Sequence, residues 1–171
     1  ARYGARLRRE QVTVLPGPNL QARARAARYK VLPRDVLTGH TADDQAETML
    51  LNLVRGAGRP GLAGMRRDQR RPLLGLRRAE TAALCAAEGL DALQDPTNVN
   101  PTHRRTRVRH EVLPLLDDVA GRDVVPVLAR QAEILGQETE LLDRLAGDLD
   151  PTDTRALESA EPALARRALR A

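Results

Sequence analysis

The near absence of aromatic side chains is the feature that most constrains how this chain can fold. Its 171 residues include no Trp and no Phe, and the aromatic residues are Tyr3 and Tyr29. Any core must therefore be built from Leu, Val and Ala. Base stacking on aromatic platforms, which is common in single-strand binders, is almost excluded. A nucleic-acid partner would have to be bound through arginines, phosphate contacts and pocket shape.

Basic side chains gather in the front part of the chain. Residues 1–110 hold 21 basic and 10 acidic side chains, a balance of +11, whereas residues 111–171 hold 7 and 13, a balance of −6. Lys30 is the only lysine. Coding bias can explain this choice of arginine, but it does not explain the clustering. The basic front part indicates an anionic partner such as a nucleotide or RNA.

Cysteine content and hydropathy indicate the compartment. Cys85 is the only cysteine, so we expect neither a disulfide framework nor a thiolate metal cluster. No stretch approaches the ~20 apolar residues of a membrane span, and no secretory pattern opens the sequence. The cytoplasm is the simplest location. Because the chain begins at Ala1 rather than Met, we expect that its natural N-terminal part is missing.

Two strand–helix units are predicted in the first half of the chain. Residues 8–15 and 35–39 are predicted strands, since short runs containing Val and Leu end at Pro or Gly. Residues 21–30, rich in Ala and Arg, and residues 41–54, with apolar side chains at helical spacing, are predicted helices. This order is typical of βαβ units and a parallel sheet. Two strands cannot form a stable doubly wound sheet, so either further strands precede the chain or the sheet prediction is wrong.

The rest of the sequence favours helices. Residues 79–89 fit a helix that ends at its final glycine. Residues 95–98 are a turn signature. Helix resumes after residue 102, with a restart at Pro114. Residues 127–149 form a long amphipathic helix with a leucine at every seventh position, and we expect it to pack against another helix.

Candidate chemistry lies in residues 38–48, where the second predicted strand meets its helix. In open α/β sheets ligands bind at such junctions. Asp43 and Asp44 precede Glu47 by four and three positions, so the carboxylates share one edge of the helix. Thr41 and Asp44 resemble a capping pair. With His40 beside them, these acids can hold Mg²⁺ against phosphates or accept a proton from an attacking amine.

A purely structural interpretation of this segment stays open. Acidic residues in a first helical turn favour the helix dipole, and His40 could simply end a strand. Acidic first turns are common, so the segment alone does not decide between structure and catalysis.

Six further motifs surround this segment in a fixed order. They occupy residues 24–29, 52–58, 61–65, 71–74, 95–98 and 105–114. Their order and spacing, from about Gln21 to Leu116, resemble those of bacterial tRNA(Ile)-lysidine synthetases, which are N-type ATP pyrophosphatases of the PP-loop superfamily.

The resemblance implies an α/β fold. We expect an incomplete parallel-sheet domain, Rossmann-like and adenine nucleotide alpha-hydrolase-like, followed by an α-helical region. Residues 1–75 would be part of the ATP pyrophosphatase domain. Residues 76–120 would complete the catalytic region with a basic motif facing tRNA or nucleotide, and residues 121–171 would be a helical linker or second domain.

The resemblance also implies an activity. Members of the family join free L-lysine to C2 of the wobble cytidine in the CAU anticodon of tRNA(Ile). The cytidine is first adenylated by ATP with release of pyrophosphate, and the lysine amine then displaces AMP. ATP and Mg²⁺ are the expected cofactors, no membrane is involved, and a homodimer is one assembly to test. The family's Ser-Gly-Gly-x-Asp-Ser loop, which cradles pyrophosphate, has no match here, so we expect the chain to be inactive alone.

The resemblance implies roles for the acidic segment. The catalytic residues would be His40, Asp43, Asp44 and Glu47. The carboxylates would serve Mg²⁺, with Asp43 and Asp44 as its ligands, or the lysine ammonium. His40 would position the nucleotide or the base.

Nucleotide or tRNA binding would fall to five arginines: Arg25, Arg28, Arg55, Arg105 and Arg109. Each has an ordinary alternative. The first two could be solvated helix-surface residues, and Arg55 could cap a helix. Arg105 and Arg109 lie four positions apart on one helical face, suited to phosphate, but could instead pair with acids such as Glu111.

Two other functions remain open. A thiolase-like PP-loop enzyme generally uses paired cysteines, and the single Cys85 argues against it. A non-catalytic basic RNA-binding module would suit the +11 front part. The carboxylate cluster opposes that alternative, because it repels phosphate unless Mg²⁺ intervenes.

Overall fold

The computed structural model describes residues 4, 6–18, 20–92 and 103–170. The chain divides into two compact units, residues 1–37 and 38–171. The first unit contains helix α1 (Leu20–Val31), preceded by an extended segment. The second unit holds all the other helices of the described residues.

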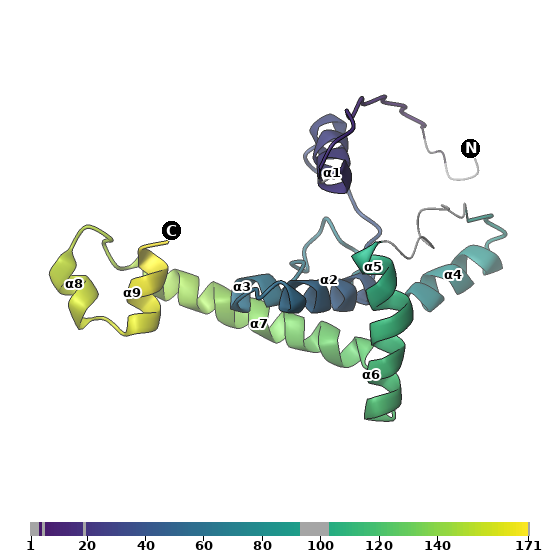
Figure 1. The fold of residues 1–171 in the computed structure, drawn as a ribbon. Helices are drawn as coiled ribbons and strands as arrows, with labels where there is room; N and C mark the ends of the chain where they lie inside the picture. Colours follow the sequence, from purple (N-terminus) through teal and green to yellow (C-terminus); the bar gives the residue numbers. More distant parts are fainter. Residues whose placement is uncertain (1–3, 5, 19, 93–102, 171) are drawn as a thin grey trace. The chain divides into compact units, whose positions relative to one another are not determined.

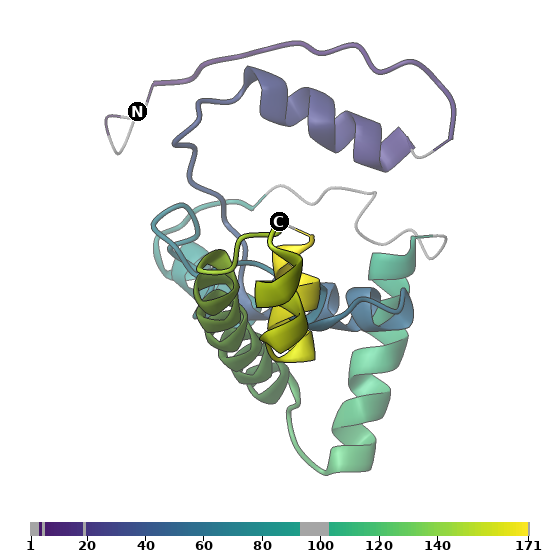
Figure 2. The same ribbon diagram turned by 90° about the vertical axis from the view of Figure 1, so that its left-hand side faces the viewer.

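Helices α2 (Ala42–Val54) and α7 (Val125–Gly147) lie along each other and form the centre of the second unit (Figure 1). The remaining elements are α3 (Arg59–Leu62), α4 (Arg78–Ala87), α5 (Arg104–Arg107), the π-helical turn η2 (Val108–Val112), α6 (Leu113–Ala120), α8 (Thr154–Ser159) and α9 (Pro162–Ala168). α3 packs on both α2 and α7, while α5 and η2 contact α2. α9 packs against the C-terminal half of α7 and lies in front in the view of Figure 2.

The core of the second unit consists of small and aliphatic side chains. Ala46 and Ala132 are fully buried, and Leu50, Val108 and Leu113 join the buried set. The small alanines allow helix backbones to approach closely, which a chain without Phe or Trp needs in order to pack well. The prediction of a core built from Leu, Val and Ala is confirmed.

The predicted α/β fold is wrong for the described residues, which contain no strand. Residues 8–15 and 35–39 are not helical, but neither forms a ladder with a neighbouring strand. Val12, Leu15 and Leu37 are 38 %, 71 % and 64 % exposed, so no sheet face buries their side chains. A strand needs a partner backbone and a packed face to be stable, and β-branched composition alone supplies neither. The parallel, Rossmann-like sheet is therefore absent from residues 4, 6–18, 20–92 and 103–170.

The structure confirms the predicted helices of the described residues. The helices predicted at residues 21–30, 41–54 and 127–149 correspond to α1, α2 and α7. The helix predicted at 79–89 is α4, followed by a glycine with φ +60°. The predicted turn at residues 95–98 lies outside the described residues. The division at residues 75 and 120 stays a prediction.

A π-helical turn interrupts the column formed by α5 and α6. The backbone N–H of Leu113 donates to the carbonyl of Val108, five residues earlier. The next residue, Pro114, lies in the first turn of α6, where its missing N–H is tolerated. The helix thus restarts beside Pro114, as expected.

None of the helices in the described part of the chain combines the length and apolar character that crossing a membrane requires.

Candidate carboxylate–arginine site

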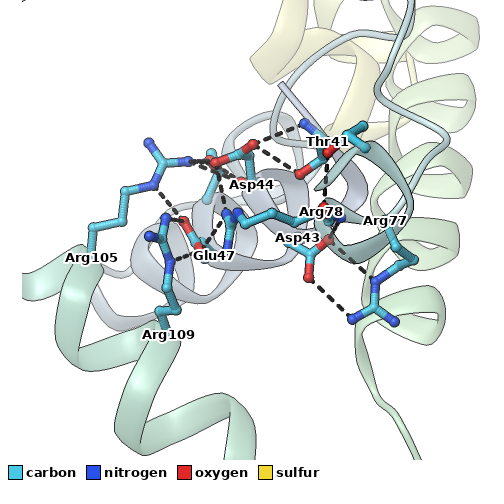
Figure 3. Close-up of polar contacts among 10 residues, drawn as sticks. Thr41, Asp43, Asp44, Glu47, Arg77, Arg78, Arg105 and Arg109 are labelled. Carbon is cyan, nitrogen blue, oxygen red and sulfur yellow. Dashed lines mark hydrogen bonds and ion pairs between the residues drawn. The ribbon is translucent and has the colours of Figure 1, made fainter. Parts of the chain in front are cut away.

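The first turn of α2 is fixed by the predicted capping pair. Asp44 Oδ2 accepts hydrogen bonds from the Thr41 backbone N–H at 2.9 Å and from the Thr41 hydroxyl at 3.0 Å. This bond satisfies an N–H that would otherwise lack a partner at the helix end. The pair holds the segment from Thr41 to Glu47 in helical register, so its three carboxylates project from one side of α2 (Figure 3).

Glu47 is the centre of the site, and its side chain is 0 % exposed. Arg105 Nε donates to Oε2 at 2.7 Å, and Arg109 Nε donates to Oε1 at 2.7 Å. Arg78 Nη2 donates to Oε1 at 3.0 Å. Three guanidinium groups from α4, α5 and η2 therefore converge on one buried carboxylate of α2 (Figure 3).

Asp43 connects α2 to the start of α4. Its carboxylate accepts from Arg77 Nε at 3.2 Å, from Arg77 Nη2 at 3.1 Å and from the Arg78 backbone N–H at 2.7 Å. Arg77 also forms an ion pair with Asp123, in the turn before α7. A single arginine thus ties the acidic segment to the α6–α7 connection.

The carboxylates are held in their charged form. Burial alone would raise the pKa of Glu47, but hydrogen bonds from Arg109 and Arg105 outweigh it and lower that pKa below its ordinary 4.5. Burial likewise opposes, and is outweighed by, Arg77 and the Arg78 backbone N–H, which lower the pKa of Asp43. For Asp44, the Thr41 N–H and two arginines overcome burial, so its pKa is also lowered. All three acids are therefore ionised at neutral pH.

In this structure the oxygens of Asp43 and Asp44 are engaged by donors of the chain itself. Their carboxylate oxygens already accept from backbone N–H groups, a hydroxyl or guanidinium groups. Across the described residues, no three or more acidic, His or Cys side chains are grouped so as to hold a metal. Mg²⁺ binding by Asp43 and Asp44 stays a prediction, and it would require Arg77 and Arg78 to withdraw.

On the opposite face of α2, Gln45 contacts the glycine-rich loop, residues 56–64, and the residue that follows it. The buried Gln45 amide donates to the carbonyls of Ala63 and Met65 at 3.0 and 2.9 Å and accepts from the Met65 N–H at 2.8 Å. Gly64 adopts φ +64° within this turn. A cavity of about 640 Å³ lies between this loop, residues 66–77 and α7.

The structure brings five of the predicted site residues together: Asp43, Asp44, Glu47, Arg105 and Arg109. The predicted alternative partner of these arginines, Glu111, pairs instead with Arg107. His40 immediately precedes the cap, with Nδ1 2.9 Å from Thr38 Oγ1.

Three predicted arginines lie elsewhere. Arg55 is exposed at the far end of α2, where its backbone N–H bonds to Leu51 and Asn52. Arg25 and Arg28 belong to the first unit, and their guanidinium carbons lie 5.0 and 5.8 Å from the ring centre of Tyr29.

Arg77 and Arg78 were not predicted as site residues, although between them they contact all three carboxylates. A usable signal was present. Two adjacent arginines at the start of a predicted helix oppose the helix dipole, which indicates that acids from elsewhere in the fold compensate them.

Comparison with known proteins decides the family of the chain. The PP-loop domain model matches residues 3–116, well over half of the sequence. The chain belongs to the PP-loop domain family. The matched region of this PP-loop chain contains the whole carboxylate–arginine cluster.

The relatives of this PP-loop chain described next are all named tRNA(Ile)-lysidine synthase. A tRNA(Ile)-lysidine synthase of Mycobacterium leprae is 47 % identical over 169 residues, covering 91 % of the chain and 52 % of the relative. One of Mycolicibacterium paratuberculosis is 55 % identical over 134 residues, covering 74 % and 42 %. One of Rhodococcus erythropolis is 44 % identical over 176 residues, covering 94 % and 54 %. The chain spans about half the length of these curated relatives.

Proposed function

We propose that the chain is part of an ATP-dependent ligase that attaches L-lysine to the wobble cytidine of tRNA(Ile) with the CAU anticodon. The observation that carries the proposal is the 44–55 % identity to proteins named tRNA(Ile)-lysidine synthase. ATP is the proposed energy source, in keeping with the PP-loop family, and Mg²⁺ the proposed metal. A cytoplasmic location and a homodimer belong to the same proposal, and sedimentation of the purified protein tests the dimer.

We assign the active centre to the acidic segment and its arginines. Asp43 and Asp44, 14 % and 19 % exposed, are the carboxylates that can still reach a ligand. His40 would position the nucleotide or base beside them. Arg105 and Arg109 would face phosphate, and Arg25, Arg28 and Arg55 would contact RNA. The buried, arginine-bound carboxylates support catalysis because active centres need charged groups held in place before substrate arrives.

Asp44→Asn in the full-length enzyme tests the proposal. The amide oxygen can still accept from the Thr41 N–H, so α2 keeps its cap, but the negative charge is lost. We expect tRNA-dependent pyrophosphate release to fall on the order of 100-fold, with tRNA binding within about twofold. Pyrophosphate release and lysine incorporation into tRNA are the measurements.

Glu111→Gln is the matched control, since Glu111 is exposed and pairs only with Arg107 among the described residues. It should leave turnover unchanged. Full turnover in Asp44→Asn would remove the acidic segment from the active centre. Absence of lysine incorporation by the wild-type enzyme, with RNA binding intact, would instead favour the non-catalytic RNA-binding module.

A further inference from the structure

A basic pocket lies between α3 and α9, at the end of the second unit away from α5 and α6 (Figure 1). Its volume is about 480 Å³. Arg59, the first residue of α3, lies on one side. Arg166, Arg167 and Arg170, from α9 and the turn that follows it, lie on the other. None of these four side chains belongs to the carboxylate–arginine site.

The composition of the surrounding sequence does not account for this group of arginines. Residues 111–171 hold 7 basic and 13 acidic side chains, and three of the seven basic ones lie within residues 166–170. Positions 163, 166, 167 and 170 follow helical spacing, and all four line the pocket. An acidic stretch of the chain therefore presents one basic face, and that face points into a pocket.

Two ion pairs fix the walls of the pocket. Glu138 on α7 pairs with Arg59, and Asp143 on the same helix pairs with Arg167. Arg167 Nη2 also donates to the carbonyl of Thr139 at 3.2 Å. Both arginines are thereby held against α7, which sets the spacing between the α3 side and the α9 side of the pocket.

The other two arginines leave the pocket positively charged. Arg166 and Arg170 are exposed, and neither forms an ion pair with an acid of the described residues. Asp143 is the one acid among the described residues that line the pocket. With Glu138, the partner of Arg59, four arginines meet two carboxylates, so 4 − 2 leaves two positive charges. The excess remains after both ion pairs are counted.

We propose that this pocket binds the phosphate backbone of RNA, with Arg166 and Arg170 contacting phosphates and with Arg59 and Arg167 as the fixed walls on either side. The inference goes beyond the proposed function, because it assigns an RNA contact outside the active centre. The choice of RNA as the anion rests on that proposed function.

The lining of the pocket favours phosphates over bases. A guanidinium group offers five N–H donors in a rigid fork that matches phosphate oxygens. Arg166 and Arg170 are separated by about one helical turn, which suits successive phosphates of one strand. Of the described residues that line the pocket, none is aromatic, so no base can stack there. Contacts of this kind position an RNA without reading its sequence.

The test measures binding of a fluorescently labelled tRNA(Ile) transcript with the CAU anticodon to the 171-residue chain, by anisotropy at several salt concentrations. The double variant Arg166→Ala, Arg170→Ala should weaken binding about tenfold at low salt. It should also lower the slope of log K against log salt by about two units, one for each lost phosphate contact.

The double variant Arg144→Ala, Arg155→Ala is the matched control. It removes two positive charges from exposed side chains of the same acidic stretch, but neither residue lines the pocket. It should leave the slope unchanged. Circular dichroism and thermal melting check the folding of both double variants. Should the first not fold, Arg170→Ala alone takes its place and should lower the slope by about one unit.

Three results would overturn the site: no RNA binding by the wild-type chain, a slope unchanged in the pocket variant, or an equal change in the control. The same pocket variant is also melted in the full-length enzyme without RNA. A loss of thermal stability there, absent from the 171-residue chain, would assign the pocket to an acidic part of the enzyme itself. Because anisotropy reports binding and not turnover, this test can succeed when lysine incorporation fails, and the reverse also holds.

Discussion

Glu47 is a fully buried carboxylate with three arginine partners. Its burial costs desolvation free energy, and its ion pairs offset that cost. Desolvating a carboxylate is expensive, and the attraction of a buried partner often only offsets that cost. Here Arg78, Arg105 and Arg109 come from elements far apart in sequence. The acid therefore contributes mainly by specifying which arrangement of α2, α4 and the α5–η2 column is adopted, rather than by adding net stability.

Stability should depend on pH through these acids. The pKa values of Asp43, Asp44 and Glu47 are lowered in the folded chain, so the unfolded chain binds protons first as the pH falls. Their contribution is fully present above the ordinary values of 3.8 and 4.5 and is lost as the pH falls through the lower, folded-state values. Urea unfolding at a series of pH values from about 7 to about 3 measures the effect.

Glu47→Gln separates the buried acid from the other carboxylates. At neutral pH it should lower the free energy of unfolding by about 2–3 kcal/mol, less than for a fully buried pair because the arginines partly reach solvent. It should also flatten the fall in stability at acid pH. A pH profile identical in slope to that of the wild-type chain would show that Glu47 is not the group responsible.

The sequence predicted which side chains share one face of a helix better than it predicted which residues of other helices they contact. Helical periodicity placed Asp43, Asp44 and Glu47 on one edge, and it placed Arg105 and Arg109 on one face. That the two sets meet could be inferred only from family resemblance. The position of Arg77 and Arg78 at a helix start indicates that acids compensate them, but which acids these are, more than 30 positions along the chain, depends on tertiary packing.

At the scale of elements, the turn of residues 61–65 is held to α2 by side-chain hydrogen bonds. Gln45 from α2 supplies three of these bonds. Gly64 allows the turn in two ways: its φ is +64°, and a Cβ there would lie 2.8 Å from Gln45 Oε1. The loop is therefore positioned by the same helix that carries the acids on its other face.

Gly64→Ala should destabilise the second unit by about 2–3 kcal/mol, from positive-φ strain of about 1–2 kcal/mol and weakened Gln45 bonds. Gly56→Ala is the matched control. Gly56 has φ +74°, but a Cβ there would meet nothing within 4 Å, so only the backbone strain applies. Thermal or urea unfolding of both variants is the measurement, and equal costs would mean that the Gln45 contact contributes nothing.

The helices were predictable because their signals are local. The capping pair of α2 and the apolar periodicity of α7 need no knowledge of the rest of the fold. The strands were not predictable in the same way, since a run such as residues 8–15 forms a strand only when another backbone pairs with it. The leucine stripe of α7 correctly predicted a helix that packs against another, since α7 contacts α2. The most deeply buried side chain on α7 is nevertheless Ala132, where close approach matters more than apolar volume.

At the scale of the whole molecule, the first unit carries exposed basic side chains of its own. Arg25 and Arg28 are exposed on α1, and the ring of Tyr29 lies near both. The carboxylate–arginine site lies wholly in the second unit. Variants in α1 therefore test RNA binding without altering any residue of the unit that carries the site.

The double variant Arg25→Ala, Arg28→Ala should weaken tRNA binding and lower its salt dependence, by about one unit of slope for each lost phosphate contact. Thermal stability should change little, since both side chains are exposed. Binding isotherms at several salt concentrations provide the slope. An unchanged slope would show that these two arginines are solvated surface residues that do not contact RNA phosphates.

The π-helical turn η2 absorbs one residue in the helical column formed by α5 and α6. A π turn contains one residue more than the α-helical turn it replaces, so deleting one residue between Arg109 and Leu113 should leave a regular helix in which Arg105 and Leu113 keep their angular relation. An inserted residue has no such outlet, because each residue of an α-helix advances the side chains by about 100°. With α6 anchored in the core by Leu113, an insertion would turn Arg105 away from Glu47. Single-residue insertions here should therefore abolish the site while single-residue deletions spare it.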